Sequence, residues 1–305
     1  MPTSILTHGR VTWTNIVQPV QADLDELGKR YPQFHLLNLR DTMSEGEFPK
    51  LDHHDDYLFL VLYLPMYDGT ERLFRPEEVD IFIAKGTLVT ASSGRLPVLN
   101  EVFRSAQQDQ YVRESLMGRG ASPLLYEVLN LFIGSVMPLL ERFDHDIHHI
   151  EANLFSSDTR HILNEIALAR RDLIALRHIL RPQLSVIRAL ADGEWPWMRE
   201  DITLYWSDIY DSLAKLQARL DEHVEVIGGL SETIDTLASH RIDEVVRVLT
   251  IITVLTLPLS LLSTVFSMNV LLPYEEHPAV FFAVVGFGVV LTAALLWYLR
   301  RRRWL

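Results

Sequence analysis

The 305-residue chain contains no cysteine, which excludes disulfide frameworks and zinc sites built from thiolates. Positive charge is also scarce, because 28 Lys and Arg stand against 40 Asp and Glu, for a formal net charge of −12. Neutralising phosphates requires a basic surface, so no nucleic-acid partner is expected. The N-terminus lacks a basic segment followed by an apolar run, and we therefore expect no secretory signal and a cytosolic N-terminal domain.

The motifs of common enzyme chemistries are missing as well. The sequence has no Gly-rich phosphate-binding loop, no nucleophile elbow and no credible hydrolytic dyad. We therefore predict that the protein is not an enzyme and requires no cofactor. The acidic balance is compatible with cations as ligands.

Two long stretches carry no charge. Residues 248–274 contain none between Arg247 and Glu275, and a second uncharged run at 278–299 is closed by four consecutive arginines. A helix needs about 20 apolar residues to cross the hydrocarbon core of a bilayer, so we predict two transmembrane helices. The loop between them has no Lys or Arg, which by the positive-inside rule places the loop outside and both termini in the cytoplasm, in an inner (plasma) membrane.

The preceding part of the chain is predicted to be an α+β cytoplasmic domain followed by long helices. The runs "DYLFLVLYLP" and "VDIFIAKGTLVTAS" are rich in β-formers and bounded by Pro, Gly and polar residues. A Ser-Pro pair at Ser122 predicts a helix N-terminus, Pro182 is expected to perturb the next helix, and the last long helix runs without proline into the first span. The expected domains are a cytoplasmic α/β domain (1–121), long cytoplasmic helices including a stalk (122–245), and two transmembrane helices with a short external loop and a basic C-terminal tail (246–305).

One side of the first span has an unusual composition: an acid, then a hydrophobic girdle, then mostly small hydroxyls. Its members are spaced by three or four residues and therefore share a helix face: Asp243, Val246, Leu249 or Thr250, Thr253, Leu257, Ser260 and Thr264. Such hydroxyls can bond back to the i−4 carbonyl or join helices. They can also line a cation pore, and because two spans cannot enclose a pore, that interpretation requires an oligomer.

The segment "VLTIITVLTLPLSLLSTVFSMN" resembles the first span of the CorA superfamily of divalent-cation channels, two-span proteins with a Gly-Met-Asn signature. The runs "HHDDYLFLVLYLP" and "GTLVTAS" resemble the N-terminal strands of that family, and the resemblance covers essentially the whole chain. It implies a CorA-like funnel, a homopentamer in the lipid bilayer whose five first spans line the pore.

The resemblance also implies roles for individual residues. The outer pore mouth would comprise Ser267, Met268, Asn269, Glu275 and Glu276. Ser260 and Thr264 would line the upper pore, Val246 and Leu249 would form a hydrophobic gate, and Asp243 would lie on its cytoplasmic side. Asp208, in "SDIYD", falls where the family has an intersubunit regulatory metal site. Its partner in such a site would be Glu77, Glu78 or Asp80. The alternative is that Asp208 is only an exposed carboxylate of the stalk.

The family's glycine is replaced here by Ser267. If the backbone geometry of the glycine is kept, serine would carry strain of roughly 1–2 kcal/mol; otherwise the helix ends differently. The predicted function is a divalent-cation channel for magnesium or cobalt, with a ZntB-like zinc transporter and a CorA-like membrane scaffold or sensor with little ion flux as alternatives. The cation is the transported and possible regulatory ion.

Two histidine clusters remain outside this interpretation. His145 and His149 are four residues apart, which is ligand spacing for zinc, beside Asp144, His148 and Glu151. A solvated helix face is the favoured interpretation. The loop from Asp52 to Asp56, with His53 and His54, has the same ambiguity.

Overall fold

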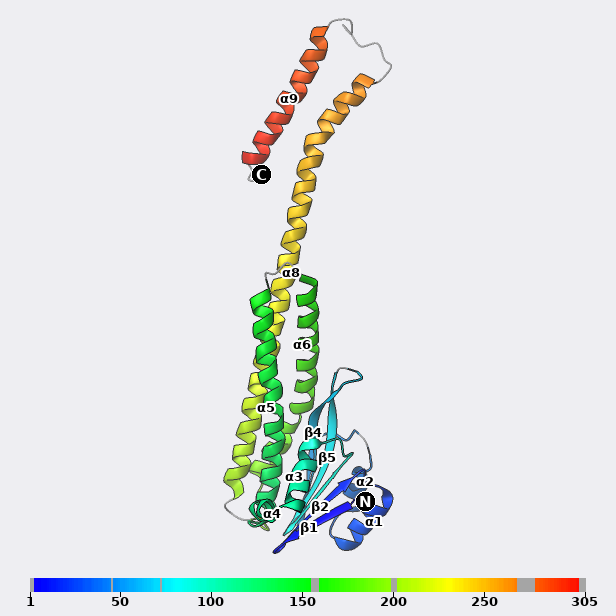
Figure 1. Cartoon of the computed structure of the whole chain (residues 1–305), viewed down its shortest axis with the longest axis vertical. Coiled ribbons are helices and arrows are strands. Elements are labelled where there is room, and N and C mark those ends of the chain that lie inside the picture. The colour runs from blue at the N-terminus through cyan, green and yellow to red at the C-terminus, as the bar shows by residue number, and fades with distance from the viewer. Residues whose placement is uncertain are drawn as a thin grey trace. The chain divides into compact units, whose positions relative to one another are not determined.

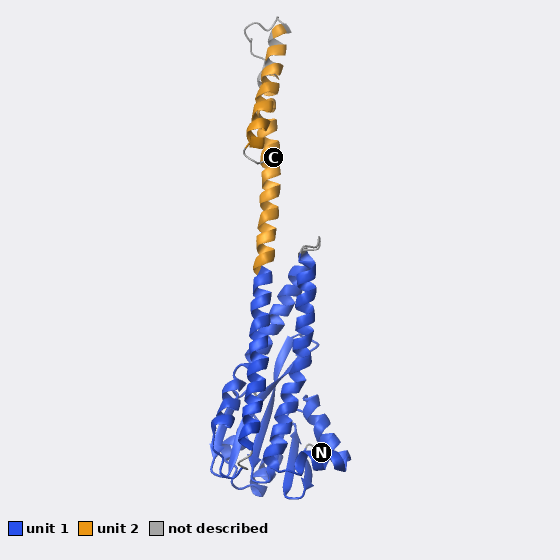
Figure 2. Cartoon of the chain, turned by 90° about the vertical axis from the view of Figure 1, so that its left-hand side faces the viewer, with its two compact units in different colours: residues 1–231 blue, residues 232–305 orange. Residues whose placement is uncertain are grey.

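The computed structural model describes residues 3–44, 46–71, 73–154, 159–198, 202–267 and 278–301 (Figure 1). The chain divides into two compact units, residues 1–231 and residues 232–305 (Figure 2). They are described separately below.

The first unit is built on a six-stranded sheet of order β1-β2-β6-β5-β4-β3. Strand β2 pairs with β6 in parallel, and the other neighbours are antiparallel. The strands are β1 (Thr3–His8), β2 (Val11–Val17), β3 (Lys50–His54), β4 (Tyr57–Asp68), β5 (Leu73–Ala84) and β6 (Thr87–Ser92). Of the two predicted β-runs, the first lies in β4 and the second spans the end of β5 and the whole of β6.

Helices cover both faces of this sheet, which explains why β4 is an almost continuous apolar run. Leu58, Leu60 and Leu62 point into a core shared with the long helices, while Phe59 and Val61 point into a second core. The alternation follows the two-residue period of a strand. The second core is closed by α1 (Gln21–Arg30) and α2 (Leu36–Asp41), which lie on one side of the sheet (Figure 1).

The other face is covered by helices that are consecutive in the chain. They are α3 (Pro97–Gln108), α4 (Gln110–Met117), α5 (Ala121–Asn153), α6 (Thr159–Leu180), α7 (Gln183–Asp192) and the first part of α8 (Thr203–Ser267). Helices α5, α6 and this part of α8 run side by side (Figure 1), and polar contacts join each pair of them. Leu213, Leu216, Leu220 and Ile227 of α8 are all buried, so the apolar face that they form packs within its own chain.

The helix boundaries test two predictions. The perturbation predicted at Pro182 is found and is a full interruption, because α6 ends at Leu180 and α7 begins after the proline. The predicted N-cap at Ser122 is wrong: α5 begins at Ala121, with Gly120 as N-cap at φ 132°. A glycine can adopt this φ without a Cβ penalty, which lets the helix start earlier.

The second unit contains the two apolar helices, the end of α8 and α9 (Pro278–Arg301). Helix α8 continues through Gly228-Gly229 and Pro258 to Ser267, as the sequence predicts. Among the described residues, α5 and α8 are long and apolar enough to span a membrane. Leu124, Leu125 and Leu140 of α5 are completely buried in the first unit, whereas none of the apolar window of α8 is buried, so α5 is a core helix.

Candidate functional site

The predicted pore-lining residues of α8 lie on the side of the helix opposite α9. A Cβ placed on Gly288 of α9 would lie 3.1 Å from a Leu262 methyl carbon and 3.7 Å from one of Leu259, so α9 packs against that side of α8. At about 100° per residue, Thr253 and Leu257 lie roughly 140–180° around the helix from Leu262. Both are exposed in the single chain. We call this row of predicted pore-lining residues the stripe: Asp243, Val246, Leu249, Thr253, Leu257, Ser260 and Thr264. The stripe is therefore left uncovered by the chain's own second apolar helix.

Half-buried positions of α8 define the complementary face. They are spaced by one, three or four residues along the helix: Ile251, Val254, Leu255, Pro258 and Leu262. The stripe residues differ from them in exposure. Asp243, Val246, Leu249, Ser260 and Thr264 are all exposed, with Val246 at 55%, Leu249 at 62% and Leu257 at 54%. Two faces of distinct composition and burial thus run along one helix.

The hydroxyls of this segment donate hydrogen bonds to carbonyls of their own helix. Thr253 donates to the Leu249 carbonyl at 2.8 Å, Thr264 to the Ser260 carbonyl at 2.8 Å, and Ser260 to the Leu257 carbonyl at 3.0 Å. This is the back-bonding expected of Ser and Thr in membrane helices. Because each proton points to the backbone, the hydroxyl oxygen presents only lone pairs to its surroundings, which suits a cation or its bound water.

The end of α8 settles the conformation of Ser267. It lies in the last turn of the helix, where its Oγ donates to the Ser263 carbonyl at 2.8 Å. The strain considered for a left-handed serine is therefore absent at this position, because the helix simply continues through it. The other predicted mouth residues, Met268, Asn269, Glu275 and Glu276, lie outside the described residues.

Asp208 is exposed near the start of α8, where its Oδ2 accepts a hydrogen bond of 3.0 Å from the Tyr126 hydroxyl. Partial burial, followed by this hydrogen bond and the carboxylate charge, raises the pKa of Tyr126. Tyr205 packs edge-to-face on Tyr126 with ring centroids 4.9 Å apart. The carboxylate is thus positioned by α5, while its outer side faces solvent in the single chain.

The three candidate partners of Asp208 have other contacts. Glu77 is buried and pairs with Arg95 at 3.1 Å, and Glu78 accepts hydrogen bonds from the Tyr63 hydroxyl at 3.0 Å and the Gly46 amide at 3.1 Å. Within the described part of the chain, no hydrogen bond or ion pair joins them or Asp80 to Asp208. Nor do three His, Asp or Glu side chains among the described residues already enclose a metal position.

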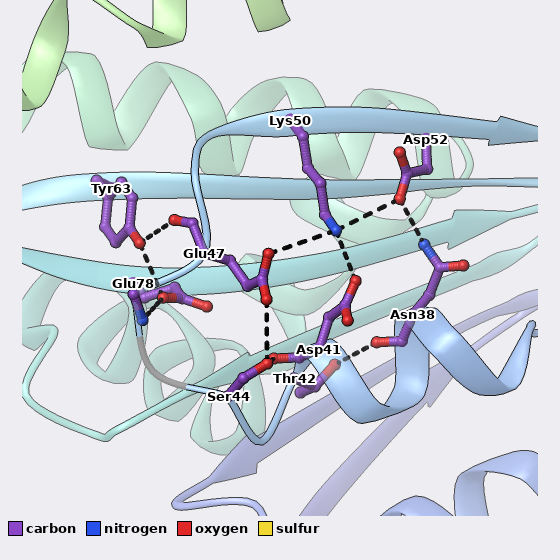
Figure 3. A network of polar contacts seen from close by, with 10 residues as sticks. Asn38, Asp41, Thr42, Ser44, Glu47, Lys50, Asp52, Tyr63 and Glu78 are labelled. Carbon is purple, nitrogen blue, oxygen red and sulfur yellow. Dashed lines mark hydrogen bonds and ion pairs between the residues drawn. The ribbon is translucent and has the colours of Figure 1, made fainter.

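A charged network that the sequence did not predict surrounds Lys50 on the α2 side of the sheet (Figure 3). Its Nζ lies 2.5 Å from Asp41 and 3.7 Å from both Glu47 and Asp52. Burial opposes the charged form, but the hydrogen bond to Asp41 and the surrounding carboxylates raise the pKa of Lys50. These residues come from a helix, a loop and a strand, and only the fold brings them together.

Asp80 is the least solvated acid near this network. It is 3% exposed, its Oδ1 has no hydrogen-bond partner within the described ranges, and the strand register places Val61 between Asp80 and Lys50. Burial raises the pKa of Asp80 well above its ordinary value, and the charges of Glu78 and Asp41 add to that effect while Lys50 opposes it. The folded protein therefore favours the protonated form of this carboxyl.

Replacing Asp80 with Asn should stabilise the protein at neutral pH. A raised folded pKa gives stability that is present below the unfolded pKa of about 3.8 and is lost as pH rises toward the folded pKa. Each tenfold change in proton affinity is worth about 1.4 kcal/mol. We expect a higher melting temperature for D80N at pH 7 than for wild type, with the gap closing as pH falls toward 4. Thermal unfolding of the full chain in detergent measures this.

The matched control is Asp55→Asn, in the exposed turn between β3 and β4. It should leave the melting temperature close to that of wild type at every pH. A gap between D80N and wild type that stayed constant from pH 4 to 8 would contradict the burial argument.

An α/β domain, long helices and two apolar helices, one of which leaves an exposed polar stripe, define a two-span membrane protein. A family model described as "CorA-like Mg2+ transporter protein" matches residues 8–301, and the chain therefore belongs to this family. It is a family of metal ion transporters and not a class of enzymes. The predicted resemblance is thus confirmed, and the chain is a divalent-cation transporter of the CorA family.

Relatives of known sequence cover most of the chain. The putative metal ion transporter YfjQ of Bacillus subtilis is 25% identical over 293 residues, covering 96% of this chain and 89% of the relative. The cobalt/magnesium transport protein CorA of Thermotoga maritima is 23% identical, covering 96% and 83%. The zinc transport protein ZntB of Pectobacterium atrosepticum is 29% identical over 142 residues, which is 46% of this chain and 43% of the relative.

Solved structures show the same fold. The complete CorA magnesium transporter of Methanocaldococcus jannaschii superposes with a TM-score of 0.80 at 19% identity, covering 98% of this chain and 94% of that chain. The full-length CmaX protein superposes with a TM-score of 0.75 at 21% identity, covering 96% and 89%. The predicted fold class is confirmed by these matches.

Proposed function

We propose that the chain assembles as a homopentamer in the inner (plasma) membrane and conducts divalent cations along the stripe of α8, with magnesium and cobalt preferred over zinc. The observation that carries the proposal is the uncovered stripe opposite α9. Two helices per chain cannot enclose a pore, so the stripes of several copies must face one another. The preferred ions are supported by the T. maritima relative, a cobalt/magnesium transport protein that this chain matches over 83% of its length.

The proposed path has three parts. At the outer mouth, Ser267, Met268 and Asn269 receive the hydrated cation, and Glu275 and Glu276 raise its local concentration. Magnesium dehydrates reluctantly, so a ring of neutral amides at Asn269 would hold its waters without stripping them. Below the mouth, the back-bonded hydroxyls of the stripe offer oxygen lone pairs.

The gate is proposed at the cytoplasmic end of the stripe. Val246 and Leu249 are exposed apolar side chains one turn apart, and rings of them would close the pore by dewetting, with Asp243 below. Both chain termini would be cytoplasmic. Asp208 would contribute to a regulatory metal site between subunits, since its outer side faces solvent in the single chain.

Flux through the purified full chain in proteoliposomes tests the function. We expect uptake of Mg²⁺ and Co²⁺, and weaker competition by Zn²⁺, measured with ion-sensitive dyes in the lumen. Zinc flux that exceeded magnesium flux would favour the ZntB-like alternative, to which the match with zinc transport protein ZntB over 142 residues gives some weight. No flux of any of the three ions would favour the scaffold or sensor.

A further inference from the structure

Two histidines from different helices flank one carboxylate where α5 and α6 lie side by side. Glu165 of α6 has its Oε2 3.5 Å from His149 Nδ1 on α5 and its Oε1 3.1 Å from His161 Nε2, one turn earlier on α6. The two imidazoles are accessible, with 51% and 62% of their side chains exposed, whereas Glu165 is 27% exposed. The sequence pairs His149 with His145, but the fold places His149 beside a carboxylate that a different histidine also approaches.

The distances match the separations between ligands of a single zinc ion. Zinc binds imidazole nitrogen and carboxylate oxygen at about 2.0–2.2 Å in tetrahedral geometry, so two of its ligand atoms lie about 3.4 Å apart. The two nitrogen–oxygen separations, 3.1 and 3.5 Å, bracket that value. Two histidines and one glutamate are also a ligand set that zinc proteins use, with water in the fourth position.

The carboxylate also has an oxygen that nothing satisfies. Glu165 Oε2 is buried and accepts no hydrogen bond from any residue that the structure describes, although His149 Nδ1 is its neighbour. If the contact were only an ion pair with an imidazolium, the ring would be expected to donate to this oxygen. A buried acceptor without a donor normally costs free energy, and a bound cation would remove that cost.

We propose that His149, His161 and Glu165 bind a zinc-class transition-metal ion that bridges α5 and α6. The two imidazoles approach different oxygens of Glu165, so the three side chains do not yet enclose an ion, and rotation of the exposed rings closes the site. Magnesium is not expected to occupy it, because that ion prefers oxygen ligands in octahedral geometry. The site is separate from the stripe of α8 and does not depend on which ion is conducted.

The sequence offers matched controls on the same helix. His145 is 84% exposed and its nearest acid is Asp146 at 4.0 Å, and His148 Nδ1 lies 2.7 Å from the Asp144 carbonyl oxygen. Among the described residues, no hydrogen bond or ion pair joins either of them to Glu165. The His145–His149 pair suggested by helix spacing is therefore not the set that the fold assembles.

Zinc titration of the purified full chain, followed by calorimetry, tests the proposal. Other zinc-binding positions are common to every variant, so the comparison isolates one class of site. His149→Ala, His161→Ala and Glu165→Gln should each weaken one equivalent of zinc binding at least about 10-fold, the lower end of what even an outer-shell change costs. H145A and H148A should bind zinc as wild type does. Cobalt(II), which absorbs strongly when tetrahedral, should give a visible spectrum in wild type and H145A that H161A lacks.

Zinc should also raise the melting temperature of wild type and H145A more than that of H161A, because a ligand bound only to the folded state stabilises it. The conservative E165Q variant keeps the size of the side chain, so its loss of binding cannot be attributed to misfolding when its circular dichroism is unchanged. Unaltered zinc binding in H161A and E165Q would overturn the site and leave two ordinary ion pairs. Loss in H145A without loss in H161A would also overturn it, in favour of the pair along α5.

Discussion

A cysteine at Thr253, Leu257 or Thr264 should make divalent-cation flux sensitive to a cationic thiol reagent. These side chains belong to the face of α8 that is exposed and opposite α9. If five such faces line the pore, a bulky positive charge attached there obstructs it sterically and repels cations electrostatically. We expect flux in proteoliposomes to fall to the level of protein-free vesicles after modification. The wild-type chain contains no cysteine, so the reagent has no other thiol to modify.

The control positions are Val254, Leu255 and Leu262, which lie on the face toward α9. Each is one or two residues along the chain from a test position. Cysteines there should leave flux unchanged by the reagent, since α9 and lipid lie on that side. Helix spacing thus predicts a pattern and not merely a sensitive region. If the reagent blocked flux at Val254 and Leu262 but not at Thr253 and Leu257, the pore would lie on the face toward α9. That result would refute the assignment of the stripe.

Much of this arrangement could be predicted from sequence because its signals are local. The uncharged runs predict the two apolar helices, and a spacing of three or four residues predicts which residues share the face that forms the stripe. The run from Tyr57 to Pro65 predicted a strand because it is apolar, contains three aromatic residues and is bounded by polar residues and Pro. Its continuous apolarity is explained by helices on both sheet faces, which β4 receives from α2 on one side and α5 on the other.

The features that the sequence did not predict depend on residues far apart in the chain. Lys50 meets Asp41 because α2 packs beside β3, and no spacing rule links position 41 with position 50. Helix spacing correctly placed His145 one turn from His149, but it could not show that Glu165 of another helix lies 3.5 Å from His149 and 3.1 Å from His161. Likewise, a serine at position 267 in place of the family's glycine suggested backbone strain, whereas the helix accommodates Ser267 with an ordinary hydrogen bond from its hydroxyl to the Ser263 carbonyl.

Replacing Asn269 with Ala should abolish divalent-cation uptake while the oligomer survives. Asn269 is two positions beyond Ser267, where α8 ends, and lies outside the described residues. A ring of amides there would bond the water shell of an arriving cation through carbonyl oxygens, and alanine offers no such acceptor. Hydrated magnesium would then have nothing at the mouth to offset the cost of entering an apolar pore. We expect uptake into proteoliposomes to fall to background for N269A.

A hydroxyl on the other apolar helix provides the control for this change. Thr292 of α9 donates to the Gly288 carbonyl at 2.8 Å and belongs to no part of the proposed path. Thr292→Ala removes a polar group from the same unit, so it should reduce uptake little while N269A abolishes it, with both variants eluting as the wild-type oligomer. If N269A took up Mg²⁺ at the wild-type rate, the amide ring would not be the site where hydrated cations enter. Selection at the mouth would then have to come from Glu275 and Glu276, whose charge would make uptake depend steeply on ionic strength, as an amide ring would not.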